Sequence, residues 1–187
     1  MRAFIALDIP EAFRSDIREL SQQLRALVKG RFMKSDTYHL TLAFLGETDE
    51  TTIQAIMPLM DNLAQSYPAV SLYPSGLGKF GRSYDATFIL KIQQNETLMH
   101  LVDDLRKQLT QKGISFDNKA FKPHITIARR ATIPKAHFDN LRFPQPTQAG
   151  RLVLYKSTLT PEGALYKPLY EVNLSGESSF NSLSQDA

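Results

Sequence analysis

The chain of 187 residues contains no cysteine. It can therefore form neither a disulfide nor a thiolate zinc site, and it has no cysteine nucleophile. Because nothing in the sequence calls for an oxidising compartment, we expect a cytoplasmic protein. Long apolar runs are missing as well, since no stretch approaches the roughly 20 apolar residues of a membrane span. The segment Met1–Pro10 is apolar, but Asp8 and Pro10 interrupt it, so we expect neither a signal peptide nor a membrane partner.

Histidine is also scarce, yet two of the four histidines stand in matching tetrapeptides, His39-Leu40-Thr41-Leu42 and His124-Ile125-Thr126-Ile127. In a β-strand successive side chains alternate between faces, so each tetrapeptide aims its histidine and threonine one way and its aliphatic residues the other. Imidazole titrates near neutrality, so two facing copies can hold one neutral and one protonated ring. The pattern predicts an acid and a base, with no metal and no cofactor.

The remaining composition permits a sizeable core and favours an anionic ligand. The hydrophobic content is 42%, which is ordinary for a globular protein. The formal net charge is +3, a mild basic excess that suits a ligand carrying phosphate. Neither histidine lies in a spaced cluster with carboxylates, so a zinc or magnesium hydrolase is not favoured.

The hydrophobic pattern predicts the same order of elements twice: a strand, a helix and then a strand carrying the tetrapeptide. Phe4 precedes His39 by 35 positions and Phe88 precedes His124 by 36, so the halves have nearly equal lengths. We therefore expect an α+β fold, bilobal and duplicated, with two pseudo-symmetric strand-helix-strand lobes around a central cleft. Strands are expected at 4–9, 38–45, 70–73, 86–92, at the second tetrapeptide, at 151–157 and at 165–174. Helices are expected from 10 to a stop at Gly30, over 50–65, and over 96–111 with Gly113 as the stop; 74–84 reads as a glycine-rich loop.

Four segments carry a family resemblance: residues 4–10, 39–47, 76–80 and 122–129. They resemble the two-histidine phosphoesterase superfamily, specifically its RNA 2',3'-cyclic phosphodiesterase branch, historically called 2'-5' RNA ligase. The resemblance covers about residues 1–174 in order and implies a single bilobal domain. The polar segment 175–187 has no counterpart and is expected to be a disordered tail.

The resemblance implies hydrolysis of a terminal 2',3'-cyclic phosphate on RNA to a 2'-phosphomonoester. His39 matches the acid that protonates O3' and His124 the base that activates water, although the residues alone leave the two assignments open. The implied partners are RNA ends or nucleotides with a 2',3'-cyclic phosphate, and no obligatory protein partner is inferred. The alternatives are a 2'-5' RNA ligase, a phosphodiesterase for small cyclic nucleotides or 2'-5' oligoadenylate, and a non-catalytic RNA-binding module.

The substrate-binding candidates begin with Thr41 and Thr126, whose hydroxyls can donate to phosphoryl oxygens. The family motif places its arginine at Arg129, but strict alternation puts Arg130 on the catalytic face. A bulge or the end of the strand after Ile127 would reconcile the two, and we favour Arg129.

The remaining aromatic residues, glycines and histidines that could belong to a site are interpreted from their positions in the expected elements. Tyr166 could stack on a base at the edge of the cleft. Phe44 falls on the face opposite His39 and is expected to pack. The glycine-rich run 76–81 has the residue pattern of a phosphate-binding loop. Such a loop needs a helix directly after it, but the sequence continues into a strand, so we expect this run to connect the two lobes instead. His100 and His137 lack a partner threonine and are expected at the surface.

Overall fold

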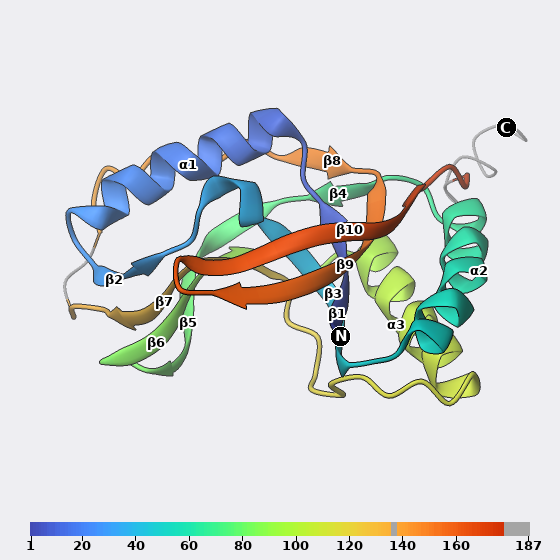
Figure 1. The fold of residues 1–187 in the computed structure, drawn as a ribbon. Helices are drawn as coiled ribbons and strands as arrows, with labels where there is room; N and C mark the ends of the chain where they lie inside the picture. The colour runs from blue at the N-terminus through green and yellow to red at the C-terminus, as the bar shows by residue number, and fades with distance from the viewer. Residues whose placement is uncertain (136–137, 178–187) are drawn as a thin grey trace, which may run out of the picture.

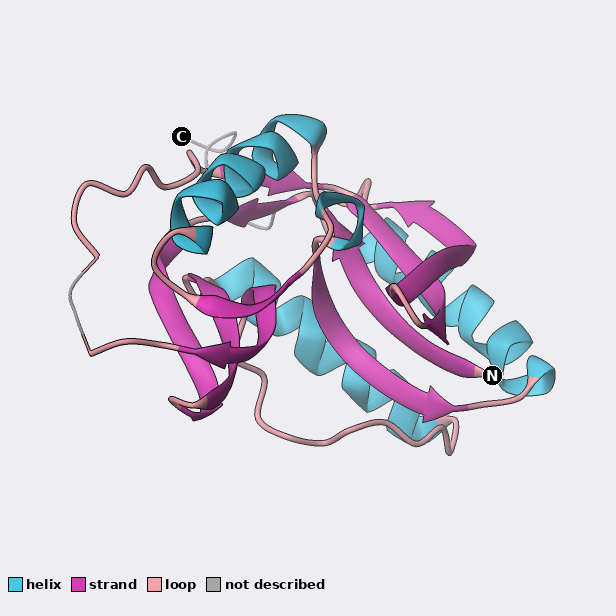
Figure 2. Cartoon of the chain, turned by 60° about the vertical axis from the view of Figure 1, so that its left-hand side comes forward, coloured by secondary structure: helices cyan, strands magenta, loops and turns pink. Residues whose placement is uncertain are grey.

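The computed structural model describes residues 1–135 and 138–177, which form two four-stranded antiparallel sheets and a short two-stranded ladder (Figures 1 and 2). The strand orders are β10-β9-β1-β3 in the first sheet, β2-β7-β6-β5 in the second and β4-β8 in the ladder. In order along the chain, the elements are β1 (Arg2–Asp8), α1 (Glu11–Arg25), β2 (Lys29–Phe32), the 3-10 helix η1 (Ser35–Thr37), β3 (His39–Glu47), α2 (Glu50–Ser66), β4 (Val70–Leu72), β5 (Pro74–Arg82), β6 (Asp85–Ile92), α3 (Glu96–Gln111), β7 (His124–Thr132), β8 (Thr147–Ala149), β9 (Arg151–Thr160) and β10 (Gly163–Asn173).

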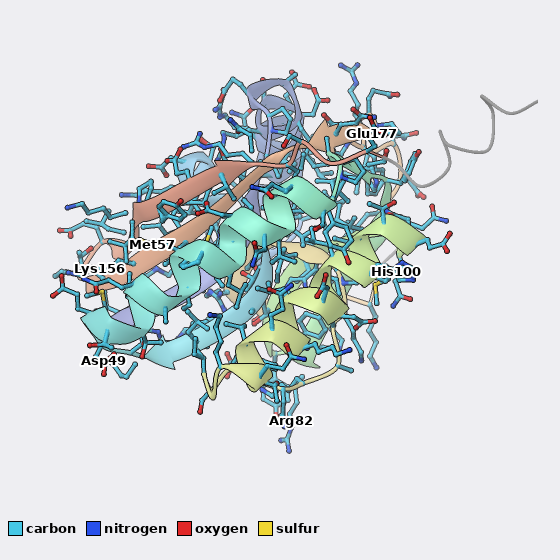
Figure 3. The ribbon with its side chains drawn as sticks, turned by 90° about the vertical axis from the view of Figure 1, so that its right-hand side faces the viewer. Asp49, Met57, Arg82, His100, Lys156 and Glu177 are labelled. Atoms are coloured by element: carbon cyan, nitrogen blue, oxygen red, sulfur yellow. The ribbon has the colours of Figure 1, made fainter. Side chains whose placement is uncertain are left out.

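The expected α+β, two-lobed fold is confirmed, and the two halves of the sequence are interleaved in it. Strands β1 and β3 of the first half pair in the first sheet, and β6 and β7 of the second half pair in the second. The helices cross over: α1 contacts β2 of the second sheet, whereas α3 contacts β3 of the first and packs beside α2 (Figures 1 and 3). Each lobe therefore contains elements from both halves of the chain.

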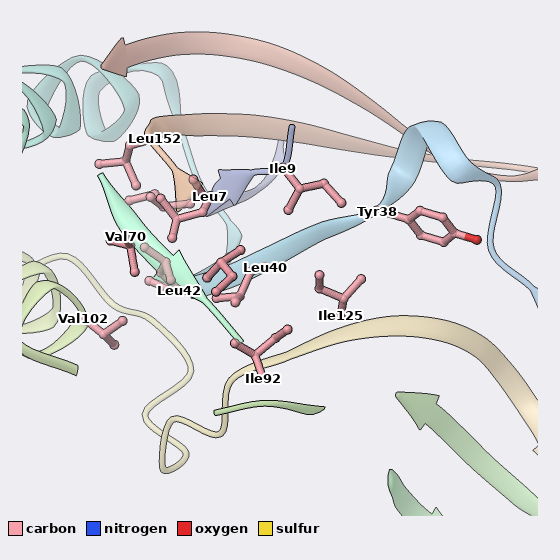
Figure 4. Close-up of a cluster of buried hydrophobic side chains, with 14 of the residues drawn as sticks. Leu7, Ile9, Tyr38, Leu40, Leu42, Val70, Ile92, Val102, Ile125 and Leu152 are labelled. Atoms are coloured by element: carbon pink, nitrogen blue, oxygen red, sulfur yellow. The ribbon is translucent and has the colours of Figure 1, made fainter. Parts of the chain in front are cut away.

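The core runs without interruption between the lobes, because the two strands that carry the tetrapeptides contact each other. Their aliphatic residues Leu40, Leu42, Ile125 and Ile127 are fully buried in one cluster. Figure 4 shows Leu40 and Ile125 facing this cluster from β3 and β7. Burial of each such side chain contributes about 1.5–3 kcal/mol, so the core fixes which face of each strand is left for chemistry.

Helix ends follow the chemistry of their capping residues. The Asp49 side chain accepts from the Thr52 amide at the start of α2, and Asn95 accepts from the Leu98 amide at the start of α3. Gly113, at φ +69°, ends α3 as expected. Pro58 lies inside α2, which continues to Ser66.

The expectation that Gly30 ends the first helix is wrong, because α1 ends at Arg25 and Gly30 lies in β2. A Cβ on Gly30 would lie 2.9 Å from the Cα of Ala131, so only glycine allows β2 to approach β7 this closely. The glycine serves a contact between strands that is remote in sequence.

The expected loop at 74–84 is also wrong, since residues 74–82 form β5 and pair with β6. Glycine lowers strand propensity, but the ladder to β6 supplies the backbone hydrogen bonds that the composition does not predict. Gly76 and Gly81 have φ values of +121° and +84°, which other residues rarely adopt. No helix follows this run, as expected.

The first residues of the expected tail are hydrogen-bonded to the end of α2. The Ser175 amide donates to the Ala64 carbonyl at 2.8 Å, and the Gly176 amide donates to the Tyr67 carbonyl at 3.0 Å. The rest of the expected tail, 178–187, lies outside the described residues, as does His137. His100 is exposed on α3 (Figure 3). None of the described helices combines the length and the apolarity needed to span a membrane.

Candidate active site

Both tetrapeptides adopt the predicted strand alternation. In β3, His39 and Thr41 are partly exposed while the residues between and after them are buried. In β7, His124 and Thr126 are partly exposed in the same pattern. Two His-Thr pairs therefore lie on the faces that the core leaves free.

Each of these strands then bulges at the same place. Ala6 pairs with Thr41 and Ile5 with Ala43, so Leu42 is an extra residue in β3. Ile89 pairs with Thr126 and Phe88 with Ala128, so Ile127 is the extra residue in β7. A bulge of one residue reverses the alternation that follows it.

The bulges bring Phe44 and Arg129 to the faces of the two His-Thr pairs, and both side chains line the cleft. The expectation that Phe44 packs on the face opposite His39 is therefore wrong, because it assumed an unbroken alternation. Arg130 has φ +48° and does not line the cleft, which leaves Arg129 as the arginine on this face.

The cleft has a volume of about 640 Å³ and takes its walls from both sheets, from α3 and from the segment before β7. The first sheet contributes Thr41 and Phe44, and the second contributes His124, Thr126 and Arg129. The other lining residues are Leu42, Phe80, Thr87, Arg106, Asp117, Lys119, Ala120, Phe121 and Lys122. His39 reaches the cleft through Thr41, whose Oγ1 lies 2.9 Å from His39 Nε2.

The two imidazoles are held in the same way by the backbone two residues earlier. His39 Nδ1 lies 2.6 Å from the Thr37 carbonyl oxygen, and His124 Nδ1 lies 2.7 Å from the Lys122 carbonyl oxygen. A carbonyl can only accept, so each Nδ1 carries a hydrogen and donates it. This leaves the Nε2 atom of each ring as the nitrogen that can take or give a proton.

Burial and nearby positive charge lower the pKa of both rings. Burial is the main cause that lowers the pKa of His39 to about 4, and the charges of Arg129, His124 and Arg14 act in the same direction against the Thr37 hydrogen bond. Burial, with Arg129, also lowers the pKa of His124, against the bond to the Lys122 carbonyl. Arg129 and the two rings thus share one electrostatic environment, in which a bound anion would favour protonation.

Aromatic side chains pack against each ring. Phe4 lies 4.8 Å from His39, and Tyr166 meets it edge to face at 5.2 Å between ring centroids. Burial raises the pKa of Tyr166, so this phenol stays neutral beside His39. Phe80 packs edge to face on His124 at 4.9 Å. Phe80 belongs to the segment 76–80 that carries the family resemblance, but its contact with His124 was not predicted, because β5 was expected to be a loop.

An arginine on α3 joins the two sides of the cleft. The Nε and Nη2 atoms of Arg106 each donate to the Leu42 carbonyl at 3.2 Å, and Nη1 donates to the Lys119 carbonyl at 2.7 Å. The Asp117 amide also donates to the Phe44 carbonyl at 2.8 Å. The segment that leads to His124 is thereby fastened to the bulge of β3.

Arg14 on α1 also binds backbone carbonyls, in the segment that leads to His39. Its guanidinium donates to the Ser35 and Tyr38 carbonyls and forms an ion pair with Asp8 at 2.9 Å. These bonds hold η1, whose Thr37 carbonyl orients His39. The role of neither arginine could be predicted from the sequence, because each binds a carbonyl far along the chain. Arg14 and Ser35 lie 21 positions apart, and Arg106 and Leu42 lie 64 positions apart.

No group of three histidine, aspartate or glutamate side chains with the geometry to hold a metal ion occurs in residues 1–135 and 138–177. The groups that can act on a phosphodiester here are the two imidazoles, the hydroxyls of Thr41 and Thr126 and the guanidinium of Arg129, because the guanidinium of Arg106 is bonded to backbone carbonyls. Together they can move protons and bind a phosphoryl group.

Comparison with known proteins agrees with this chemistry. Residues 9–159 match the family model of the 2'-5' RNA ligase superfamily. A Thermotoga maritima protein named RNA 2',3'-cyclic phosphodiesterase is 36% identical over 182 residues, covering 94% of this chain and 97% of that protein. A Methanocaldococcus jannaschii protein of the same name is 28% identical over 91% of this chain and 99% of its own length.

Solved structures give the same result. Escherichia coli LigT in complex with 3'-AMP has a TM-score of 0.75 and 27% identity, over 93% of this chain and 98% of that one. TT0787 of Thermus thermophilus has a TM-score of 0.79 and 28% identity, over 95% of this chain and 100% of that one.

Proposed function

The chain belongs to the 2'-5' RNA ligase superfamily, and from this we propose that it is an RNA 2',3'-cyclic phosphodiesterase that opens a terminal 2',3'-cyclic phosphate to a 2'-phosphomonoester. One observation carries the proposal beyond the family: His39 and His124 are bonded through Nδ1 to the backbone, so each keeps Nε2 for proton transfer, with His124 lining the cleft and His39 next to Thr41, which lines it.

The reaction exchanges one P–O bond for another. The oxygen of water forms a bond to phosphorus as the bond from phosphorus to O3' breaks. His124 Nε2 takes the proton of the water, and protonated His39 gives its proton to O3'. The 2' linkage is retained, so the product is a 2'-phosphomonoester. No metal is required, since both proton transfers have a side chain assigned to them.

The hydroxyls and the guanidinium bind the phosphoryl oxygens. Thr41 and Thr126 donate to the non-bridging oxygens, on which charge builds in the transition state. Arg129 adds a fixed positive charge at the same face, in preference to Arg130. Stacking of Tyr166 on the substrate base stays a prediction, beside its observed contact with His39.

The bound substrate supplies the negative charge that favours protonation of His39. In the free protein burial and Arg129 favour neutral rings, so a proton has to be taken up for His39 to act as an acid. The negative phosphodiester offsets the charge of Arg129 and raises the pKa of both imidazoles. Binding and proton uptake are therefore coupled, and one ring becomes protonated in the complex.

Product analysis with an RNA oligonucleotide that ends in a 2',3'-cyclic phosphate tests the proposal, with excess chelator present throughout. A single 2'-phosphomonoester is expected, and a 3'-phosphate would contradict the bond assignment. His39→Ala and His124→Ala should each lower kcat by about 10²- to 10⁴-fold, the usual contribution of general acid-base catalysis. Near-normal turnover in either variant would remove that residue from the mechanism.

The same experiment separates the alternatives. Addition of an RNA with a free 5'-hydroxyl gives a joined product if the chain is a ligase. Turnover of cyclic mononucleotides or 2'-5' oligoadenylate without turnover of RNA indicates a small-molecule phosphodiesterase. Binding of RNA without any turnover indicates the non-catalytic module.

A further inference from the structure

A second groove, with a volume of about 560 Å³, adjoins the cleft. The two share Phe80 and Lys122 in their walls, so the groove opens beside His124, on which Phe80 packs. Lysines 79, 91 and 122 line the groove, and its lining contains no carboxylate. The proposed reaction makes no use of this region.

The glycine-rich strand β5 gives one of these lysines its position. Lys91 pairs with His124 across β6 and β7, so both side chains lie on the same face of the sheet. A Cβ on Gly78 would lie 3.1 Å from Lys91 Cδ, and one on Gly76 would lie 3.8 Å from its Cε. The glycines leave room for the lysine stem to lie across β5.

The charge of these lysines is available to a ligand. Lys79 Nζ donates to the Gly81 carbonyl at 2.8 Å, a neutral partner. Within the part of the chain that the structure describes, no carboxylate forms an ion pair with Lys79, Lys91 or Lys122, and all three residues are exposed. Three unneutralised ammonium groups beside a phosphate-binding cleft favour a polyanion.

We propose that this groove binds the RNA strand on the 5' side of the terminal nucleotide, with the lysines on its internucleotide phosphates. The inference rests on the proposed function, because it takes the cyclic phosphate as bound between the two histidines. Only the 5' side of such a substrate continues as a chain, so the strand must leave the cleft past its rim, where the shared residues Phe80 and Lys122 lie. Phe80 offers a face for a base at that point, and the Gln93 and Gln94 amides can meet base edges. The groove makes the protein selective for RNA ends over cyclic mononucleotides.

The test compares kcat/KM for a cyclic-phosphate tetranucleotide with kcat/KM for the cyclic mononucleotide of the same terminal base. The wild-type ratio should exceed about tenfold, and Lys91→Gln and Lys79→Gln should each lower the ratio by roughly fivefold. The dependence of log kcat/KM on log salt for the tetranucleotide should become shallower by about 0.7 for each internucleotide phosphate that a variant no longer binds. Gly78→Ala displaces the Lys91 stem without removing its charge and should lower the ratio less. Lys107→Gln, on the exposed side of α3, removes the same charge and should leave the ratio unchanged.

Equal kcat/KM for the two substrates in the wild type would refute RNA binding in the groove and leave the proposed function standing. An equal fall of the ratio in Lys107→Gln would also overturn it, because the effect would then reflect overall charge. If neither substrate is hydrolysed, the proposed function itself fails. Direct binding of the 2'-phosphate tetranucleotide, weakened by Lys91→Gln but not by Lys107→Gln, would still support the groove in that case, and equal weakening would overturn it.

Discussion

Replacing Arg106 by methionine would test whether the link between α3, the β3 bulge and the segment before His124 matters for catalysis. Methionine keeps an apolar stem against the rings of Phe116 and Phe121, which the guanidinium carbon approaches within 5.6 and 5.7 Å of their centroids. It removes every donor to the Leu42 and Lys119 carbonyls. The variant therefore isolates the hydrogen bonds from the packing.

The expected cost follows from the exposure of the two carbonyls. The Lys119 bond is exposed, so water can replace the donor there, whereas the Leu42 bonds are partly buried and their loss costs about 2 kcal/mol. Removal of the cation–π interaction with both rings adds roughly 0.5 kcal/mol at such a site. A total of about 2.5 kcal/mol corresponds to a fall in Tm of roughly 5–10 °C for a chain of this length.

The effect on kcat distinguishes positioning from stability. At a temperature well below both unfolding transitions, we expect Arg106→Met to have the circular dichroism of the wild type and a kcat lower by at least about tenfold, because displacement of a catalytic group by about 1 Å can cost 10²-fold. Arg106→Lys can reach one carbonyl and should recover part of the rate. Lys107→Met, on the next position of the same helix, is the control. A lowered Tm with an unchanged kcat would refute the positioning role.

Three further predictions concern the pH profile, the hydroxyl beside His39 and the close approach of β2. The pKa values of both histidines lie below the ordinary value of 6.5, at about 4 for His39, and the active free enzyme carries one proton on the pair. The kcat/KM profile should therefore be a bell on the acid side of pH 6.5, falling as pH rises above that value, and a maximum above pH 7.5 would contradict it. Thr41→Val keeps the strand but removes the hydroxyl 2.9 Å from His39 Nε2, so kcat should fall by about 10- to 100-fold with little change in Tm; an unchanged kcat would exclude Thr41 from the site. Gly30→Ala places a Cβ against the backbone of β7 and should lower the unfolding free energy by about 1–3 kcal/mol, whereas Gly150→Ala meets only an ordinary contact of 3.5 Å; equal denaturant midpoints for the two variants would contradict the close approach.

The sequence predicted the elements whose signals are local. The helix at 96–111 was predicted with its observed bounds, because its periodic apolar face lies within it and its glycine stop lies just beyond its end. The strands at the two tetrapeptides followed from their alternation of aliphatic and polar residues. The predicted order of strand, helix and tetrapeptide strand recurs in the structure as β1, α1 and β3 and again as β6, α3 and β7.

Features that depend on distant contacts could not be predicted in this way. Alternation assumes an unbroken strand, so Phe44 was assigned to the wrong face and Arg129 needed an assumed bulge. Both bulges are set by pairing with neighbouring strands. The crossing of α1 and α3 between the sheets, and the bonds of Arg106 across the cleft, connect positions far apart in the chain.

The central claim is that His39 and His124 face one phosphate, and an NMR titration of the imidazoles tests it most directly. The pKa of each ring is measured with and without a 2'-phosphomononucleotide, with His39→Gln and His124→Gln used to assign the signals and His100 as the exposed internal control. We predict that one bound nucleotide raises the pKa of both rings and leaves that of His100 unchanged. A rise at only one of the two rings, or at neither, would contradict a shared phosphate site.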